Sequence, residues 1–272
     1  WDEYYAQKYD GQYDNSADLV KQEDIDAAIS AVTEVVCKYR VNFQIINTYT
    51  WAVIAQGWRT DYIAGTGTFW DDKYILTAGH LILKDGLYED YAGGLLFRDY
   101  VTLQEIFFFN GNTKVIVQKI FSSFGDNQVD VAVLRLPSGI DVPDFKVAIG
   151  KTADLSYGDF IYQIGINYQF IDNVSSETDL KNTHPYLLDG VVGSADISFI
   201  DKPAEMPWCV NDLFCGTDNS WEGFSGGPTL AIRDGKLELV GINSGGMNAG
   251  LGFVTEIEAI KTALEGAGIF LF

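Results

Sequence analysis

Three residues whose types could carry out nucleophilic catalysis occur in order along the chain: His80, Asp130 and Ser225. The sequence has 2 histidines, His80 and His184, so an imidazole base active near neutral pH has two candidates. His80 ends a strand-like run that starts at Tyr74, and a scaffold often presents functional side chains at such positions. An isolated histidine is more often structural, so the assignment depends on its partners.

Asp130 and Ser225 each have a local setting that suits a partner role. Asp130 opens an alternating apolar run, where an acid costs stability unless something pairs with it; the plainer alternative is a strand-edge aspartate facing water. Ser225 lies in the run Gly223-Phe-Ser225-Gly-Gly-Pro228. Glycines around a serine allow a tight turn that exposes the hydroxyl and directs backbone N–H groups at one point. The alternative there is an ordinary glycine-rich turn.

At these motifs the chain resembles the chymotrypsin-like serine proteases of the trypsin fold. The matching runs, in the order of that family, are Gly65-Thr-Gly-Thr-Phe, Thr77-Ala-Gly-His80, Asp130-Val-Ala-Val, Gly223-Phe-Ser225-Gly-Gly-Pro228 and Gly241-Ile-Asn-Ser-Gly-Gly. The resemblance covers roughly residues 43–265. Each motif is weak alone, but three in the right order and with family-like spacing are specific. The Gly-x-Ser-x-Gly pattern also occurs in α/β-hydrolases, but that fold needs a histidine after the serine and none follows Ser225.

The resemblance implies a secreted serine endopeptidase that cleaves peptide bonds through an acyl-enzyme intermediate, with no cofactor and no metal. Ser225 would be the nucleophile, His80 the general base, and Asp130 the group that orients the imidazole. The backbone N–H groups of Gly223 and Ser225 would form the oxyanion hole. Ser244 matches the family serine that supports the aspartate and opens the strand that binds the substrate backbone.

The resemblance also places the primary specificity pocket. Its floor falls at Asn219, and the other expected substrate-binding residues are Ser220, Ser244, Gly245, Gly246 and Gly252. An amide floor has no fixed charge and disfavours a strong preference for Arg or Lys, although a one-residue shift would bring in Asp218. Glutamyl-specific relatives carry a histidine where Asn243 stands. We therefore expect a medium to large uncharged side chain in the pocket.

Two departures separate the chain from the digestive branch of the family. Phe224 replaces the acidic residue that pairs with a freshly cut N-terminus, and a long segment precedes His80. The sequence is therefore closer to the bacterial glutamyl-endopeptidase-like and HtrA-like branches.

The elements that would position these residues are mostly short strands. Runs of β-branched and aromatic residues, separated by Gly, Asn and Asp clusters, continue from about residue 43, with a proline-marked seam at Pro137–Pro143. We expect an all-β fold of two six-stranded antiparallel β-barrels, at 43–140 and 141–272, with a short C-terminal helix. Residues 1–42 would form an acidic, Tyr-rich arm and an amphipathic helix whose apolar positions run from Ile25 to Val36.

The amino-acid composition limits which partners the protein could bind and where it could be located. The chain has 272 residues, a formal net charge of −20 and a hydrophobic fraction of 47%, which excludes a disordered chain. The acidity disfavours nucleic acid as a partner, and no apolar run is long enough to span a membrane. Trp1 is not an initiator Met, and the simplest interpretation is a processed, secreted chain. Cys209 and Cys215 frame a loop that a disulfide could close, with zinc as the weaker alternative; Cys37 would then be free.

Two other hypotheses remain. The chain could be a protease-fold structural or binding protein with a relic or self-processing triad, docking a partner through residues 1–42. Residues 1–42 could instead be an inhibitory pro-segment.

Overall fold

The computed structural model describes residues 10–17, 20–125, 128–168, 177, 180–181, 183–194, 213–216 (backbone), 223–247 and 251–271. Its helices are α2 (Gln22–Ser30) and α3 (Ile257–Gly266), with short 3-10 turns at Gly79–Leu81 and Thr152–Asp154. Its strands are β1 (Val32–Asn47), β2 (Val53–Phe69), β3 (Tyr74–Thr77), β4 (Gly86–Ala92), β5 (Leu95–Asn110), β6 (Thr113–Ser123), β7 (Val131–Arg135), β8 (Ala148–Ile149), β9 (Phe160–Ile166), β10 (Pro185–Ser194), β11 (Leu213–Gly216), β12 (Pro228–Arg233), β13 (Lys236–Met247) and β14 (Leu251–Glu256).

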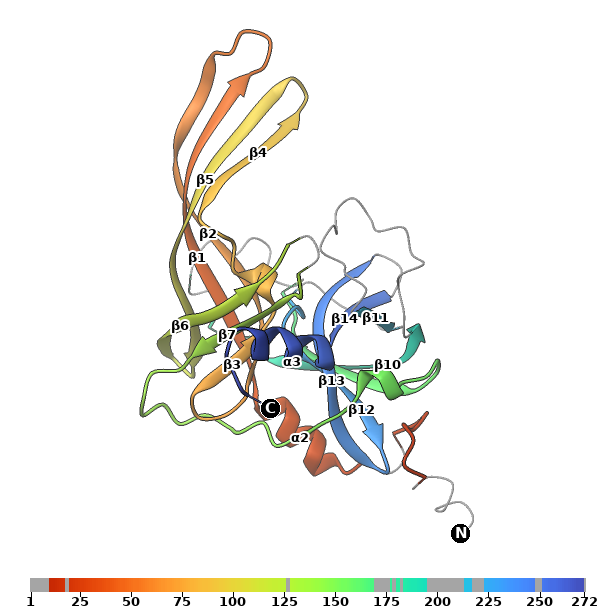
Figure 1. The fold of residues 1–272 in the computed structure, drawn as a ribbon. Helices are drawn as coiled ribbons and strands as arrows, with labels where there is room; N and C mark the ends of the chain where they lie inside the picture. Colours follow the sequence, from red (N-terminus) through yellow and green to blue (C-terminus); the bar gives the residue numbers. More distant parts are fainter. Residues whose placement is uncertain are drawn as a thin grey trace.

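These strands form two closed antiparallel barrels (Figure 1). The first runs β1-β2-β3-β7-β6-β5 and closes through pairing of β1 with β5, while β4 adds to the outer side of β5. The second runs β12-β9-β10-β11-β14-β13 and closes through pairing of β12 with β13; β8 pairs with β13 in parallel. Closure leaves few open edges in either ring. The expected two-barrel fold is therefore confirmed.

The N-terminal helix is shorter than the periodicity of its apolar residues predicts. It ends at Ser30, and β1 begins at Val32, so residues 32–42 belong to a barrel strand rather than to an extension. The run from Val32 to Cys37 is rich in β-branched residues, which pack well on a sheet and lose side-chain freedom in a helix. Cys37 lies in this strand, free and buried, and burial raises the pKa of its thiol to about 12.

Both helices fill the junction between the barrels. One apolar cluster joins Ile25 and Ala28 of α2 with Ile260 and Leu264 of α3, and it includes residues of both barrels, among them Leu76, Val133, Ile164 and Leu239. Complete burial of a large aliphatic side chain contributes about 1.5–3 kcal/mol to stability. The helices thus hold the barrels against each other. No helix within the described ranges is long and apolar enough to cross a membrane.

Residues 10–17 lie against the second barrel. Tyr13 forms an isolated antiparallel bridge with Arg233, whose guanidinium lies 4.2 Å from the centroid of the Tyr13 ring. The Tyr13 hydroxyl donates to Glu238 (2.9 Å) and accepts from the backbone N–H of Lys151 (2.9 Å). This part of the predicted arm is therefore anchored to the body of the protein.

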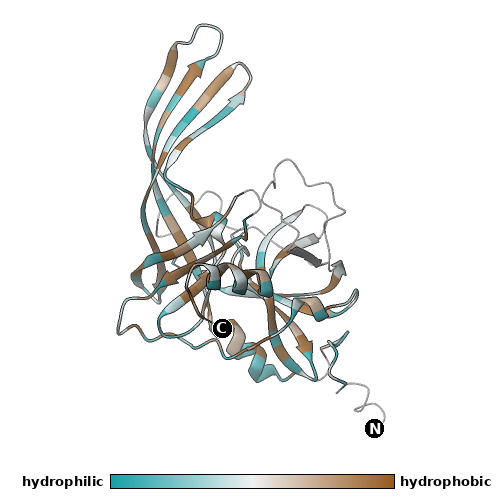
Figure 2. Cartoon of the chain, viewed as in Figure 1, coloured by the Kyte–Doolittle hydropathy of each residue, from teal (hydrophilic) through white to brown (hydrophobic). Residues whose placement is uncertain are grey.

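A four-stranded extension projects from the first barrel (Figure 1). It consists of the ends of β1 and β2 together with β4 and the start of β5, paired in the order β2-β1-β5-β4. Apolar and polar stretches alternate along these strands (Figure 2). Trp51, Trp58, Tyr91 and Tyr100 expose more than half of their surface here, at 66%, 66%, 62% and 53%. The strand pattern of the sequence does not predict this extension.

Candidate active site

His80 is held in place by both its backbone and its ring. It lies in the 3-10 turn Gly79–Leu81, directly after β3. Its backbone N–H donates to Oδ1 of Asp130 (2.8 Å), and its ring Nδ1 lies 2.7 Å from Oδ2 of the same carboxylate. Because an ionised carboxylate only accepts, Nδ1 carries the proton in the neutral ring and Nε2 is left as the basic nitrogen. Gly79 is required because a Cβ there would collide with the backbone carbonyl of Ser123.

Asp130 connects the two barrels. It precedes β7 of the first barrel and is 2% exposed, and Ser244 of β13 in the second barrel donates its hydroxyl to Asp130 Oδ2 at 2.6 Å. Its two oxygens thus accept three hydrogen bonds, which satisfies a buried charge that would otherwise be costly. Asp130 thus contacts both His80 and Ser244, while their roles in a reaction stay a prediction.

The charges of His80 and Asp130 shift each other's titration. Burial opposes the imidazolium form, but the negative charge of Asp130 and its hydrogen bond outweigh burial, so the pKa of His80 is raised. Burial likewise favours a neutral Asp130, but the charge of His80 and the hydrogen bonds from His80 and Ser244 outweigh it, so the pKa of Asp130 is lowered. At neutral pH the carboxylate is ionised and oriented toward the imidazole.

Ser225 lies in a loop whose glycines have backbone conformations that other residues rarely adopt. Gly223 has φ of 98° and Gly226 has φ of 90°. A Cβ on Gly223 would collide with Tyr168 and with the carbonyl of Ile166. Phe224 points inward and is fully buried against Gly165 of β9. The loop is therefore anchored by Phe224, while the Ser225 side chain stays only half-buried.

The loop lies against the turn that carries His80. The carbonyl of Ser225 accepts from the backbone N–H of Thr66 (2.8 Å). A Cβ on Gly65 would come within 2.5 Å of Leu81 and 2.9 Å of that same Ser225 carbonyl. A Cβ on Gly226 would lie 2.7 Å from the backbone nitrogen of Ala78. The structure thus brings Ser225 to the same junction as His80 and Asp130.

The predicted specificity pocket is described only in part. Asn219, Ser220 and Asp218 lie outside the described residues. Gly246 of β13 is directly opposite Gly252 of β14, and Gly252 is in turn opposite Gly216 of β11. Three glycines side by side on neighbouring strands leave a strip without side chains. Gly246 and Gly252 are neighbours on adjacent strands, and Gly245 lies opposite Phe253.

Sequence reasoning missed some contributors to the site. Asn243, considered above for specificity, is fully buried and accepts a hydrogen bond from Thr229 (2.7 Å), so it supports β12. Gly216 lacks a motif of its own. Thr66 binds the Ser225 loop. It lies in the matched run Gly65-Thr-Gly-Thr-Phe, and that run is the signal that could have singled it out.

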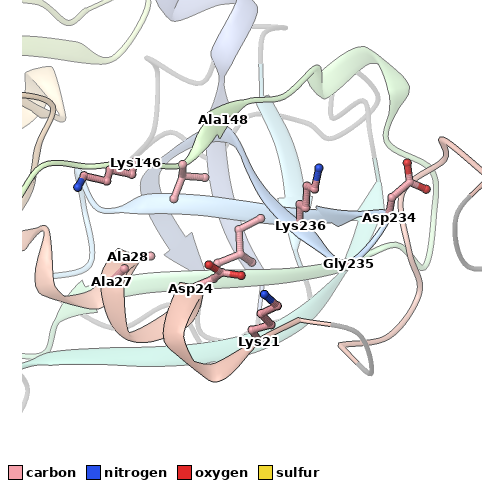
Figure 3. Close-up of a pocket in the computed structure, with 11 residues that line it drawn as sticks. Lys21, Asp24, Ala27, Ala28, Lys146, Ala148, Asp234, Gly235 and Lys236 are labelled. Atoms are coloured by element: carbon pink, nitrogen blue, oxygen red, sulfur yellow. The ribbon is translucent and has the colours of Figure 1, made fainter.

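A separate hollow lies away from this cluster. It has a volume of about 510 Å³ between α2 and the β12–β13 hairpin, and its lining includes Lys21, Asp24, Lys146, Asp234 and Lys236 (Figure 3). None of the predicted site residues lines it. Within the described ranges, no group of three or more His, Cys, Asp or Glu side chains is arranged to hold a metal ion. Cys209 lies outside the described residues and Cys215 is described only in its backbone, so a disulfide or zinc site there stays a prediction.

Two antiparallel six-stranded barrels with a His–Asp pair and a glycine-flanked serine at their junction define a double-barrel serine hydrolase of the chymotrypsin type. Residues 41–264 match the trypsin family. The chain therefore belongs to the trypsin family of serine proteases, as the sequence motifs indicated. The search of curated proteins gave no match.

Solved structures share this fold. A variant of the HtrA-type protease AlgW with a tripeptide is 14% identical with a TM-score of 0.56, covering 91% of this chain and 63% of its own. AlgW with a decapeptide is 15% identical (TM-score 0.55; 92% and 68% covered). The inactive form of the Rv3671c protease is 17% identical (TM-score 0.52; 92% and 95% covered). The chain thus spans about two thirds of the AlgW structures, and the three matches show a shared fold.

Proposed function

We propose that the chain is a serine endopeptidase that works through an acyl-enzyme intermediate, with Ser225 as nucleophile, His80 as base and Asp130 as the orienting acid. The observation that carries this proposal is the Asp130 carboxylate. It binds the backbone and ring of His80 and also Ser244, beside the glycine-rich loop of Ser225. A purely structural histidine would not need a buried ionised acid aimed at its Nδ1.

The reaction follows from this arrangement. The Ser225 oxygen attacks the scissile carbonyl carbon while Nε2 of His80 takes the hydroxyl proton. The C–N bond then breaks, the imidazolium returns the proton to the leaving amine, and an ester remains on Ser225. Water attacks that ester with the same base, which releases the acid product and restores the serine. The N–H groups of Gly223 and Ser225 would stabilise both tetrahedral intermediates.

The substrate proposed is a protein or peptide segment with an uncharged side chain at the residue before the cut. The glycine strip of Gly216, Gly246 and Gly252 supports this, because it leaves room next to the β13 strand edge. The AlgW structures named above hold peptides, which fits a peptide ligand for this fold. Asn219 and Ser220 are proposed to complete the pocket.

We also propose that the protein is secreted. Its net charge of −20 and pI of about 4.2 fit an extracellular protein. Its three cysteines allow one disulfide, a bond that persists outside the cell. Recovery of the protein from the medium, rather than from cell lysate, would test this proposal.

The alternative of a binding protein with a relic site has less support. Tyr13, Ile25 and Ala28 are buried against the barrels, so the described part of residues 1–42 is packed onto the body of the protein and is not a free docking arm. The same burial counts against a detachable pro-segment. Relic enzymes also have no reason to keep a paired His80 and Asp130.

A peptide library digested by the wild-type chain and by Ser225→Ala, and read by mass spectrometry, tests the proposed function. We expect internal cleavage after uncharged residues by the wild type and none by the variant. Equal cleavage in both samples, or none by the folded wild type, would refute the proposal.

A further inference from the structure

We propose that Thr66 is a positioning residue that holds the Ser225 loop, residues 223–225, in the conformation that forms the oxyanion hole. The inference rests on the proposed function and adds a residue of the first barrel to machinery that otherwise belongs to the second. Thr66 lies in β2, is fully buried and takes no part in the triad.

Thr66 makes four hydrogen bonds that converge on the site. Its backbone N–H donates to the carbonyl of Ser225 (2.8 Å), and its hydroxyl donates to the carbonyl of Gly223 (2.6 Å). The same hydroxyl accepts from the backbone N–H of Ile166 in β9 (2.8 Å). Its carbonyl accepts from the hydroxyl of Thr77 (2.6 Å), three residues before His80. Thr66 thus connects Gly223 and Ser225, the two ends of the loop, to β3, the strand that precedes His80.

Because of the packing around Gly223, the hydrogen bond from the Thr66 hydroxyl determines how the Gly223 carbonyl is oriented. Gly223 lies against the Tyr168 ring and the carbonyl of Ile166, with a positive φ of 98°. The loop therefore cannot move toward β9. Rotation of the Gly223 carbonyl the other way would break its hydrogen bond to Thr66 and leave a buried acceptor unpaired. The Thr66 hydroxyl therefore favours the loop conformation seen in the structure.

This restraint matters for catalysis because an oxyanion hole works by preorganisation. The N–H groups of Gly223 and Ser225 must already point at the place where negative charge develops. A donor that is misaligned in the resting enzyme lowers the stability of the tetrahedral intermediate more than that of the bound substrate. Loss of the Thr66 hydroxyl should therefore reduce kcat and leave KM nearly unchanged.

The chain supplies a matched control at Thr68. It lies two residues further along β2 on the same face and is 1% exposed. Within the described part of the chain its hydroxyl has no hydrogen-bond partner. Thr68→Val removes the same group from the same strand at similar depth, without changing a contact to the loop.

The experiment compares the wild type, Thr66→Val, Thr66→Ser and Thr68→Val on a peptide cleaved in the library assay. We expect Thr66→Val to lower kcat by about 10- to 100-fold with KM changed by less than about 2-fold. Thr66→Ser keeps the hydroxyl and should restore most of the rate, and Thr68→Val should match the wild type. The midpoint of the pH–rate profile should stay unchanged in all four, because the pair of His80 and Asp130 is not altered.

Other results would overturn the proposal. A Thr66→Val enzyme with wild-type kcat would show that the hydroxyl does not position the loop, while the proposed function would stand. A loss shared equally by Thr66→Val and Thr68→Val, or a rate that Thr66→Ser does not restore, would indicate general loss of packing. A folded wild type that cleaves nothing would refute the proposed function itself, and this inference with it.

Discussion

At the scale of single residues, the site depends on the hydrogen bonds that offset the free-energy cost of burying the Asp130 carboxylate. A carboxylate that is 2% exposed survives as an ion because His80 supplies two donors and Ser244 a third. The same contacts fix the imidazole tautomer. The Ser244 bond also makes the site depend on contact between the barrels, since it crosses their junction.

The pH dependence of peptide hydrolysis tests this pair. Neutral His80 is the active form, so kcat/KM should rise with pH through the His80 pKa, and its midpoint should lie above 6.5 because Asp130 raises that pKa. Asp130→Asn removes the charge that stabilises the imidazolium and permits the wrong tautomer. We expect that variant to lose about 10⁴-fold in kcat, with the midpoint moved down. A wild-type profile that is flat between pH 5 and 8 would contradict the assignment of His80.

At the scale of elements, the motif residues were predictable and their supports were not. His80, Asp130, Ser225 and Ser244 stand in short patterns whose chemistry is visible in sequence. Thr66 stands in the matched run Gly65-Thr-Gly-Thr-Phe, but the run does not reveal its role, because that role depends on which loop of the second barrel reaches β2 in three dimensions. The end of α2 was also misjudged, since the apolar residues from Val32 to Val36 fit both a helix face and a buried strand.

The four-stranded extension was missed for a similar reason. Val53 to Trp58 has the composition of a strand, and nothing local says whether a barrel will close around it. Its exposure follows from the length of β1 and β2, which pair over more residues than the ring uses. The local sequence thus predicts that a strand forms, whereas the tertiary structure determines whether that strand is buried.

The glycine loop gives a prediction at this same scale. Gly223→Ala places a methyl group against Tyr168 and the Ile166 carbonyl, so the loop must shift and an oxyanion donor is lost. We expect at least a roughly 10²-fold fall in kcat. Gly93→Ala is the control: its φ is 58°, but a Cβ there meets nothing within 4 Å, so it should cost about 1–2 kcal/mol of stability and no activity. Wild-type activity in Gly223→Ala would contradict the assigned loop geometry.

At the scale of the whole molecule, the N-terminal segment is part of the folded body. Residues 10–17 bind the second barrel, α2 enters the core between the barrels, and β1 is a strand of the first. Removing residues 1–42 would therefore take away core side chains and eleven residues of β1, from Val32 to Asn42. Activation by such a cut would require the barrel to close without them.

Tyr13→Phe tests the structural role of the N-terminal segment by removing a single hydroxyl group. The change deletes a hydrogen bond to Glu238 and leaves the Lys151 N–H without its acceptor, which should lower the free energy of unfolding by about 1–3 kcal/mol. Urea unfolding measures the loss, and peptide hydrolysis below the transition should be unchanged. Tyr157→Phe, at a side chain that is 83% exposed, is the control and should be neutral. Higher activity in Tyr13→Phe would instead indicate an inhibitory segment.

The central claim is that Ser225, His80 and Asp130 form one working nucleophile. It is tested most directly by treating the folded wild type, Ser225→Ala and His80→Ala with a fluorophosphonate and mapping the modified peptide by mass spectrometry. The reagent forms a Ser225 O–P bond and releases fluoride only where base and oxyanion hole activate the serine. We predict labelling confined to Ser225 in the wild type, none in Ser225→Ala and a strongly reduced rate in His80→Ala. A folded wild type that stays unlabelled, or that is labelled at another residue, would contradict the account.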